Sequence, residues 1–181
     1  MQRHNSMFVT FVRTGERRYA VRAVVEGKAV VAMSPAPGYD PIAPHDLQHV
    51  IVERSLGIEG GVFGQLAAGG TAGTFNAVGV SGRSQRSRER RKRAAKQAKL
   101  RFRRDDPVRS ERATYVCWHN WLSQSNDATL RAKARAMEKT VYSTINGMHA
   151  DERALHSTAK LTHVRAEFER LSARWSKLKV G

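Results

Sequence analysis

Two histidines and two carboxylates lie close together in the segment PHDLQHVIVE. On a helix with about 100° between residues, His45 and His49 are separated by about 40°, and Asp46 and Glu53 lie within about 100° of His45. Four side chains with ligand atoms would therefore share one face of the helix. Two imidazoles and a carboxylate can bind one divalent ion and leave a position open for water. The spacing predicts a metal site, with zinc as the first candidate ion.

The same residues also have a purely structural explanation. Asp46 is a first-turn acid of the kind that the helix dipole favours. His49 and Glu53 form an i,i+4 pair, which stabilises a helix by about 0.2–0.5 kcal/mol. Two histidines can also pack where a helix meets a sheet. The spacing alone leaves the metal site and the structural role both open.

A basic segment, residues 83–104, is the second functional candidate. It holds twelve Lys and Arg residues against one acid, Glu89, in a chain of formal net charge +16. Arginine matches phosphate with two hydrogen bonds, and neutralising phosphates releases counterions. The segment predicts binding of nucleic acid or another polyanion; the alternative is a solvated, partly disordered insertion without a partner. The predicted contact residues are Arg83, Arg86, Arg88, Arg90, Arg91, Lys92, Arg93, Lys96, Lys99, Arg101, Arg103 and Arg104.

Several other functional classes are disfavoured by the sequence. The single cysteine, Cys117, excludes an intramolecular disulfide and any multi-cysteine zinc module. No phosphate-binding glycine motif of the dinucleotide or P-loop type is present. The charge-free stretch 60–82 is rich in glycine and has few large apolar side chains, and the start of the chain lacks a secretory signal. These features predict a cytoplasmic protein without a membrane partner.

The N-terminal residues predict a small antiparallel sheet. Three runs rich in β-branched and aromatic residues, 7–13, 19–25 and 29–33, are separated by turn signals. The proline-rich stretch 34–44 then ends the sheet. A helix is expected from Pro44 to Leu56, ended by Gly57, and a short second helix from Val62 to Ala68, which together carry the histidines.

The remaining residues predict helices at about 85–100, 110–122, 127–147 and 150–178. The last of these carries an apolar seam that we expect to pack against the preceding helix as an antiparallel pair. The predicted fold class is therefore α+β in a single domain, residues 1–181. Its parts are β-hairpins (1–35), the histidine-bearing and short helices (44–68), a glycine-rich loop (69–84), a basic helix or disordered segment (85–104) and a helical part (108–181).

The run HDLQH resembles the HDxxH zinc motif of the coenzyme Q biosynthesis protein family, whose members are linked to handling of the quinone precursor ring. The resemblance implies that His45, Asp46 and His49 are metal ligands. The glutamate that follows in that family falls on Gly61 here, so that Glu59 or Glu53 would have to replace it. That family is helical ahead of the motif, whereas this chain predicts strands there.

A broader resemblance is to an uncharacterised bacterial family of small proteins. It is carried by the run 35–75, with PHDLQHVIVE, LGIEGGVFGQLAAGG and the glycine loop, and by ARWSKL near the C-terminal end. The resemblance implies a shared fold and no defined function.

The sequence therefore supports three alternative functions and does not decide whether the protein is an enzyme. The first is a divalent-metal-binding domain with ligands among His45, Asp46, His49, Glu53 and Glu59. The second is a non-enzymatic module that binds a polyanion through residues 83–104. The third is a scaffold that binds a partner, or a second copy of itself, through its C-terminal helices.

Overall fold

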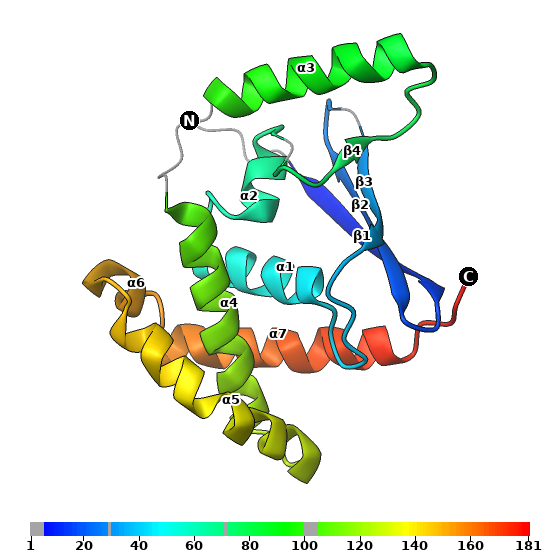
Figure 1. Ribbon diagram of the computed structural model, residues 1–181. Coiled ribbons are helices and arrows are strands. Elements are labelled where there is room, and N and C mark those ends of the chain that lie inside the picture. The colour runs from blue at the N-terminus through cyan, green and yellow to red at the C-terminus, as the bar shows by residue number, and fades with distance from the viewer. Residues whose placement is uncertain (1–5, 29, 71, 100–104) are drawn as a thin grey trace.

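The predicted α+β class is confirmed by the computed structural model, which describes residues 6–28, 30–70, 72–99 and 105–181 (Figure 1). Strands β1 (Met7–Gly15), β2 (Arg18–Val25), β3 (Val31–Ala36) and the very short β4 (Asn76–Ala77) form one antiparallel sheet in the order β1-β2-β3-β4. The first three strands match the predicted ones. The fourth comes from the glycine-rich loop, where the sequence predicted no strand.

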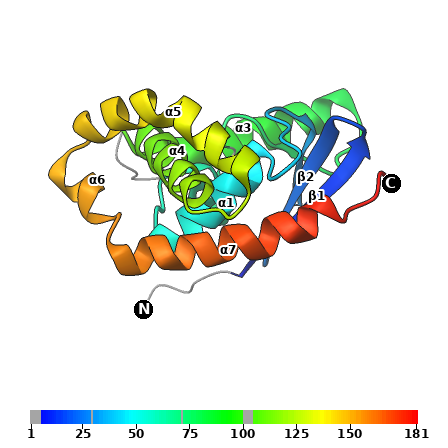
Figure 2. The same cartoon turned by 90° about the horizontal axis from the view of Figure 1, so that it is seen from below.

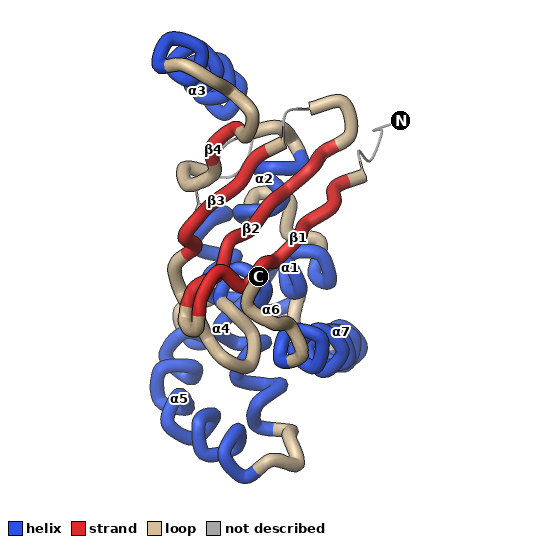
Figure 3. Tube along the Cα trace, turned by 90° about the vertical axis from the view of Figure 1, so that its right-hand side faces the viewer, coloured by secondary structure: helices blue, strands red, loops and turns tan. Residues whose placement is uncertain are grey.

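One face of the sheet is covered by helices and the other is open to solvent (Figure 3). The alternation along β2 produces this difference, because Tyr19, Val21, Ala23 and Val25 are buried while the exposed Arg22 points the other way. The buried row packs into the main core of the protein.

Helix α1 (His45–Leu56) lies at the centre of the fold, beside the sheet (Figure 1). It begins after Pro44 and ends at Gly57, whose φ of 72° places it in the left-handed region that favours glycine. Buried apolar residues, including Leu47, Ile51 and Val52, fix its inner face. The short helix α2 (Val62–Ala67) follows after one turn and packs against the sheet.

Helix α3 (Arg83–Lys99) stands at one end of the molecule, above β4 and α2 and away from the other helices (Figure 1). The basic segment is thus helical where the structure describes it. Its side chains are largely exposed, since the helix offers almost no large apolar residue for packing.

Helices α4 (Asp106–Ser123), α5 (Ala128–Asn146), α6 (Ala150–Ala154) and α7 (Thr158–Ser176) form the helical half. The predicted last helix is divided, because residues 155–157 leave the helix and Ser157 begins a new one. Helix α5 pairs with α4, while α7 packs mainly against α1 and α4 and crosses beneath them (Figure 2). The antiparallel pair is therefore formed by α4 and α5. The apolar seam of α7 is buried against α1 and α4 and not, as expected, against the preceding long helix.

Within the described part of the chain, no helix is both long and apolar enough to cross a membrane. The glycine-rich stretch that follows α2 forms turns and β4 instead.

Candidate metal centre

His45 and His49 of α1 meet Glu111 of α4 in a group that can hold a metal ion. One ligand atom from each of the three lies within 4.8 Å of the other two. Nε2 of His45 is 3.5 Å from Oε2 of Glu111, and Nε2 of His49 is 3.3 Å from Oε1 of the same carboxylate. Zinc bonds of about 2.0–2.2 Å allow ligand atoms to lie up to about 4.4 Å apart. Small rotations of the exposed side chains, His45 and Glu111, bring all three within reach of one ion.

Nδ1 of His49 is held by a buried hydrogen-bond network. Ser110 donates its hydroxyl proton to Oε1 of Glu53 at 2.7 Å, so the Ser110 oxygen can accept from Nδ1 of His49 at 3.0 Å. The hydroxyl of Thr114 lies 3.3 Å from the same nitrogen. The proton of neutral His49 therefore belongs on Nδ1, and its lone pair on Nε2. Histidine ligands of metals are usually oriented by such a hydrogen bond from the other ring nitrogen.

Nε2 of His49 is buried and faces Glu111. It lies 3.3 Å from Oε1 of that carboxylate, an ion pair when the ring is protonated, and it has no well-aligned hydrogen bond to any described residue. The side chain is only 2% exposed, so water cannot easily satisfy this nitrogen. The ring of His45 stands nearly perpendicular to that of His49, with the centroids 4.6 Å apart. Nε2 of His49 thus faces the two other candidate ligands, and it can offer its lone pair to a metal ion once the ring has lost its proton.

The charges around the cluster are strongly coupled. Burial lowers the pKa of His49, but the carboxylates of Glu111 and Glu53 outweigh this effect and raise it to about 9. The imidazoles of His45 and His49 hold the pKa of Glu111 well below its usual range. Glu111 is therefore an ionised ligand, and a metal ion has to displace a proton from His49 before it binds.

The predicted ligand Glu53 is buried at 3% exposure and is not part of the cluster. Its carboxylate accepts hydrogen bonds from the backbone N–H groups of Val62 and Phe63, both at 2.8 Å, and from Gly64 at 3.3 Å. These are orphan donors of the first turn of α2. Glu53 therefore joins α1 to α2 and orients His49 through Ser110.

Asp46 is also turned away from the cluster and toward the sheet. Its Oδ2 lies 2.5 Å from the hydroxyl of Tyr19, which also donates to the carbonyl of Pro37. A phenol carries one proton, so both contacts are hydrogen bonds when the Tyr19 hydroxyl donates to Pro37 and a protonated Asp46 donates to the Tyr19 oxygen. Burial raises the pKa of Asp46 toward that neutral form. The contact anchors the first turn of α1 to β2.

Glu59 is exposed in the turn before α2 and is not part of the cluster that can hold a metal. Gly61, where the resembled family has its glutamate, lies against the carboxylate of Glu53. A Cβ on Gly61 would come within 2.3 Å of Cδ of Glu53. The absence of a side chain at residue 61 therefore lets the Glu53 carboxylate reach α2.

Glu111 was not predicted from the sequence, because it comes from α4 and meets α1 only after folding. A weaker signal was present in the same helix. Ser110 and Thr114 continue the buried stripe that includes Cys117 and Trp121. Two hydroxyls within an apolar stripe need buried partners, which here are His49 and Glu53.

The predicted polyanion contacts are distributed along α3. The side chains of Arg83, Arg86, Arg88, Arg90, Arg91, Lys92, Lys96 and Lys99 are exposed, and Arg93 is partly buried. Arg101, Arg103 and Arg104 lie outside the described residues. The structure therefore gathers the basic side chains that it describes on a single protruding helix.

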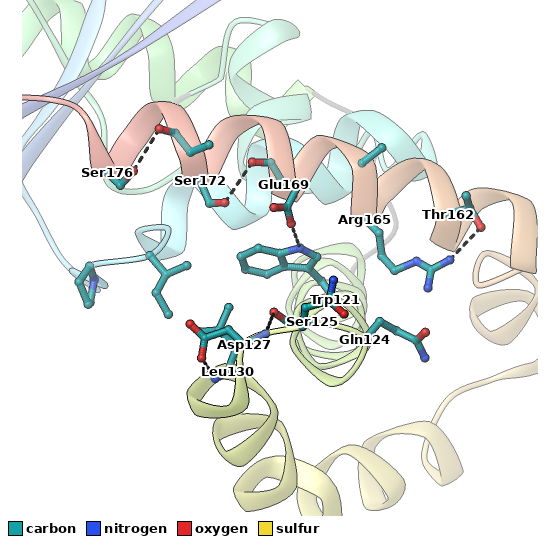
Figure 4. Close-up of a pocket in the computed structure, with 15 residues that line it drawn as sticks. Trp121, Gln124, Ser125, Asp127, Leu130, Thr162, Arg165, Glu169, Ser172 and Ser176 are labelled. Atoms are coloured by element: carbon teal, nitrogen blue, oxygen red, sulfur yellow. Dashed lines mark hydrogen bonds between the residues drawn. The ribbon is translucent and has the colours of Figure 1, made fainter.

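A hollow of about 830 Å³ lies elsewhere, between the end of α4, the start of α5 and α7 (Figure 4). Its polar groups are largely paired with one another or with nearby backbone. The indole of Trp121 donates to Glu169 at 3.1 Å, and Asp127 accepts from the backbone of Thr129 at 2.7 Å as the cap of α5. The hollow contains neither histidine of the metal cluster, so we place the candidate centre at His45, His49 and Glu111.

No protein-family model, curated protein or solved structure matches this chain.

Proposed function

We propose that the protein is a divalent-metal-binding domain whose ligands are His45, His49 and Glu111. The single observation that carries this proposal is the convergence of one ligand atom from each of these residues within 4.8 Å, with the buried Nε2 of His49 facing the other two groups. Two imidazoles and one carboxylate form a ligand set that suits zinc and other first-row metals. Zinc remains the first candidate.

The arrangement has an open side. The side chains of His45 and Glu111 are 48% and 58% exposed, whereas His49 forms the buried floor. Three protein ligands leave a coordination position for water or substrate, and a metal ion there would lower the pKa of a bound water or polarise a carbonyl. The ligand set and this access from solvent support hydrolytic or lyase chemistry as the reaction class.

Metal content provides the direct test. Purified protein is expected to contain about one equivalent of a divalent metal by elemental analysis. The His45→Ala/His49→Ala variant is expected to lose it, because a single remaining carboxylate cannot retain the ion. Glu111→Gln is expected to weaken binding while keeping the shape of the side chain.

Matched substitutions at exposed positions show whether a loss of metal is specific to the proposed ligands. His163→Ala and Glu138→Gln remove the same groups from exposed positions on α7 and α5. Both variants should keep the metal. Metal-free wild-type protein that also fails to bind added zinc, iron or manganese, while remaining folded, would contradict the proposal.

The exposure of α3 favours a second candidate function, the binding of a polyanion. The guanidinium groups of Arg83, Arg88 and Arg91 line one shallow, solvent-open hollow on this helix. Arginine side chains arranged along one helix face suit successive phosphates. We propose a nucleic acid bound without sequence specificity as the ligand of this face.

This second function predicts a strong dependence on salt. Affinity for a short oligonucleotide should fall by about 10³-fold or more between about 50 and 200 mM salt if six or more phosphates are contacted. Neutralising Arg88 and Arg91 together should weaken binding and flatten the salt dependence, as measured by fluorescence anisotropy. Neutralising the exposed Arg135 and Arg174 on other helices is the control. Equal weakening by the two pairs would contradict an interface on α3.

A further inference from the structure

A second group of cations surrounds a smaller hollow on the inner side of α3. Lys92, Arg93 and Lys96 project from α3, and Lys28 projects from the turn between β2 and β3. The hollow has a volume of about 270 Å³ and its apolar lining includes Leu66. It shares no residue with the metal cluster and involves the face of α3 that turns toward the sheet.

Two of these cations are held by backbone carbonyls, one at the last residue of α2 and one three residues after it. Lys28 donates from Nζ to the carbonyl of Ala67, and Arg93 donates from Nη2 to the carbonyl of Gly70. The last carbonyls of a helix lack partners within the helix, which explains why cations collect there. The two side chains are therefore held with their charges facing the hollow.

The guanidinium group of Arg93 is only partly satisfied. Its Nη1 is buried and has no hydrogen-bond partner among the described residues. Burial lowers the pKa of Arg93, with the nearby Glu89 opposing the effect. A buried donor on a charged group is costly unless an acceptor reaches it. Arg93 lines the hollow together with Lys92 and Lys96, so an acceptor bound there would lie beside its guanidinium group.

The side chains of Lys28 and Lys96 both lie close to Gly69. A Cβ on this glycine would lie 2.6 Å from Nζ of Lys96 and 3.3 Å from Cδ of Lys28. Gly69 also has a φ of 89°, so both its backbone and its lack of a side chain permit the approach. Burial and the charge of Lys96 lower the pKa of Lys28. Four cations thus line the hollow with only one carboxylate, that of Glu89.

We propose that this hollow is a binding site for a phosphate group, held by Lys28, Arg93 and Lys96. A phosphate oxygen would accept from the unpaired Nη1 of Arg93, and its charge would relieve the repulsion between the two lysines. The volume of the hollow is just below the range of about 300–1,000 Å³ that is usual for pockets that bind drug-sized ligands. It therefore suits a free phosphate, a small phosphorylated molecule or one phosphate of a nucleic-acid backbone.

The test uses the full chain and inorganic phosphate as the probe, measured by isothermal titration calorimetry at low salt. We expect saturable binding of about one phosphate per chain. Arg93→Gln should weaken it about tenfold or more, because it removes a charged donor that nothing else replaces. Arg135→Gln makes the same change at an exposed position of α5, outside this hollow and away from α3, and should leave the affinity for phosphate nearly unchanged.

Lys96→Gln provides a second variant that keeps the contact of Arg93 with Gly70, and circular dichroism verifies the fold of each variant. Lys96→Gln should also weaken phosphate binding relative to Arg135→Gln. Competition between phosphate and a short oligonucleotide would identify a backbone phosphate as the source, and simultaneous binding would identify a free or small-molecule phosphate. Absence of phosphate binding, or equal loss in Arg93→Gln and Arg135→Gln, would overturn the site.

Discussion

Replacing Glu53 with alanine is expected to lower the free energy of unfolding by about 3–5 kcal/mol, the cost of removing one partner from a buried charged network. The Glu53 carboxylate accepts from three backbone N–H groups of α2 and from the hydroxyl of Ser110. Its removal leaves these buried donors without an acceptor, and each unsatisfied group costs about 1–3 kcal/mol. Such a loss is a large part of the about 5–15 kcal/mol by which a domain is stable.

Equilibrium denaturation in urea measures the effect, with Glu59→Ala as the matched control. Glu59 is exposed in the turn before α2, so its removal should change the stability by less than about 0.5 kcal/mol. Glu53→Gln should lie between the two, because the amide keeps one acceptor oxygen. A Glu53→Ala variant as stable as Glu59→Ala would show that the carboxylate does not hold α2 in place.

The elements of the fold were largely predictable because their signals are local. The run of β-branched and aromatic residues in β2 and the glycine that ends α1 are signals of neighbouring residues, and both elements appear in the structure as predicted. The pairing of the last helix was not predictable in the same way. The seam containing Val164 and Phe168 identified a buried face but not the helix that covers it. That choice depends on which helices the loops bring together.

The candidate site was predictable only in part for the same reason. The spacing of His45 and His49 within one helix identified them as neighbours, and the structure brings them together. Glu111 is more than sixty residues away in the sequence and joins them only because α1 packs against α4. Helical spacing also could not show that Asp46 and Glu53 would bond to Tyr19 and to α2. For residues of one helix, a shared azimuth is therefore not sufficient for joint ligation, and a ligand from another helix, such as Glu111, is not found by helical spacing at all.

Phe168→Ala is expected to destabilise the protein by about 3–5 kcal/mol, as is usual for deletion of a fully buried ring. Phe168 is completely buried on α7, and its ring centroid lies 5.4 Å from that of Trp118 and 5.3 Å from that of Trp121. The neighbouring indoles are large and rigid, so they cannot collapse to fill the cavity. Because α7 packs on both α1 and α4, the cavity also weakens the contact that brings the histidines to Glu111.

Phe8→Ala makes the same substitution at an exposed position. Phe8 lies on β1 and is 71% exposed, so its loss should change the free energy of unfolding by less than about 0.5 kcal/mol. Denaturation curves of the two variants, measured side by side, isolate the contribution of burial from that of the ring itself. Equal stability of the two variants would mean that α7 does not form the buried junction with α1 and α4. The metal ligands would then need another element to align them.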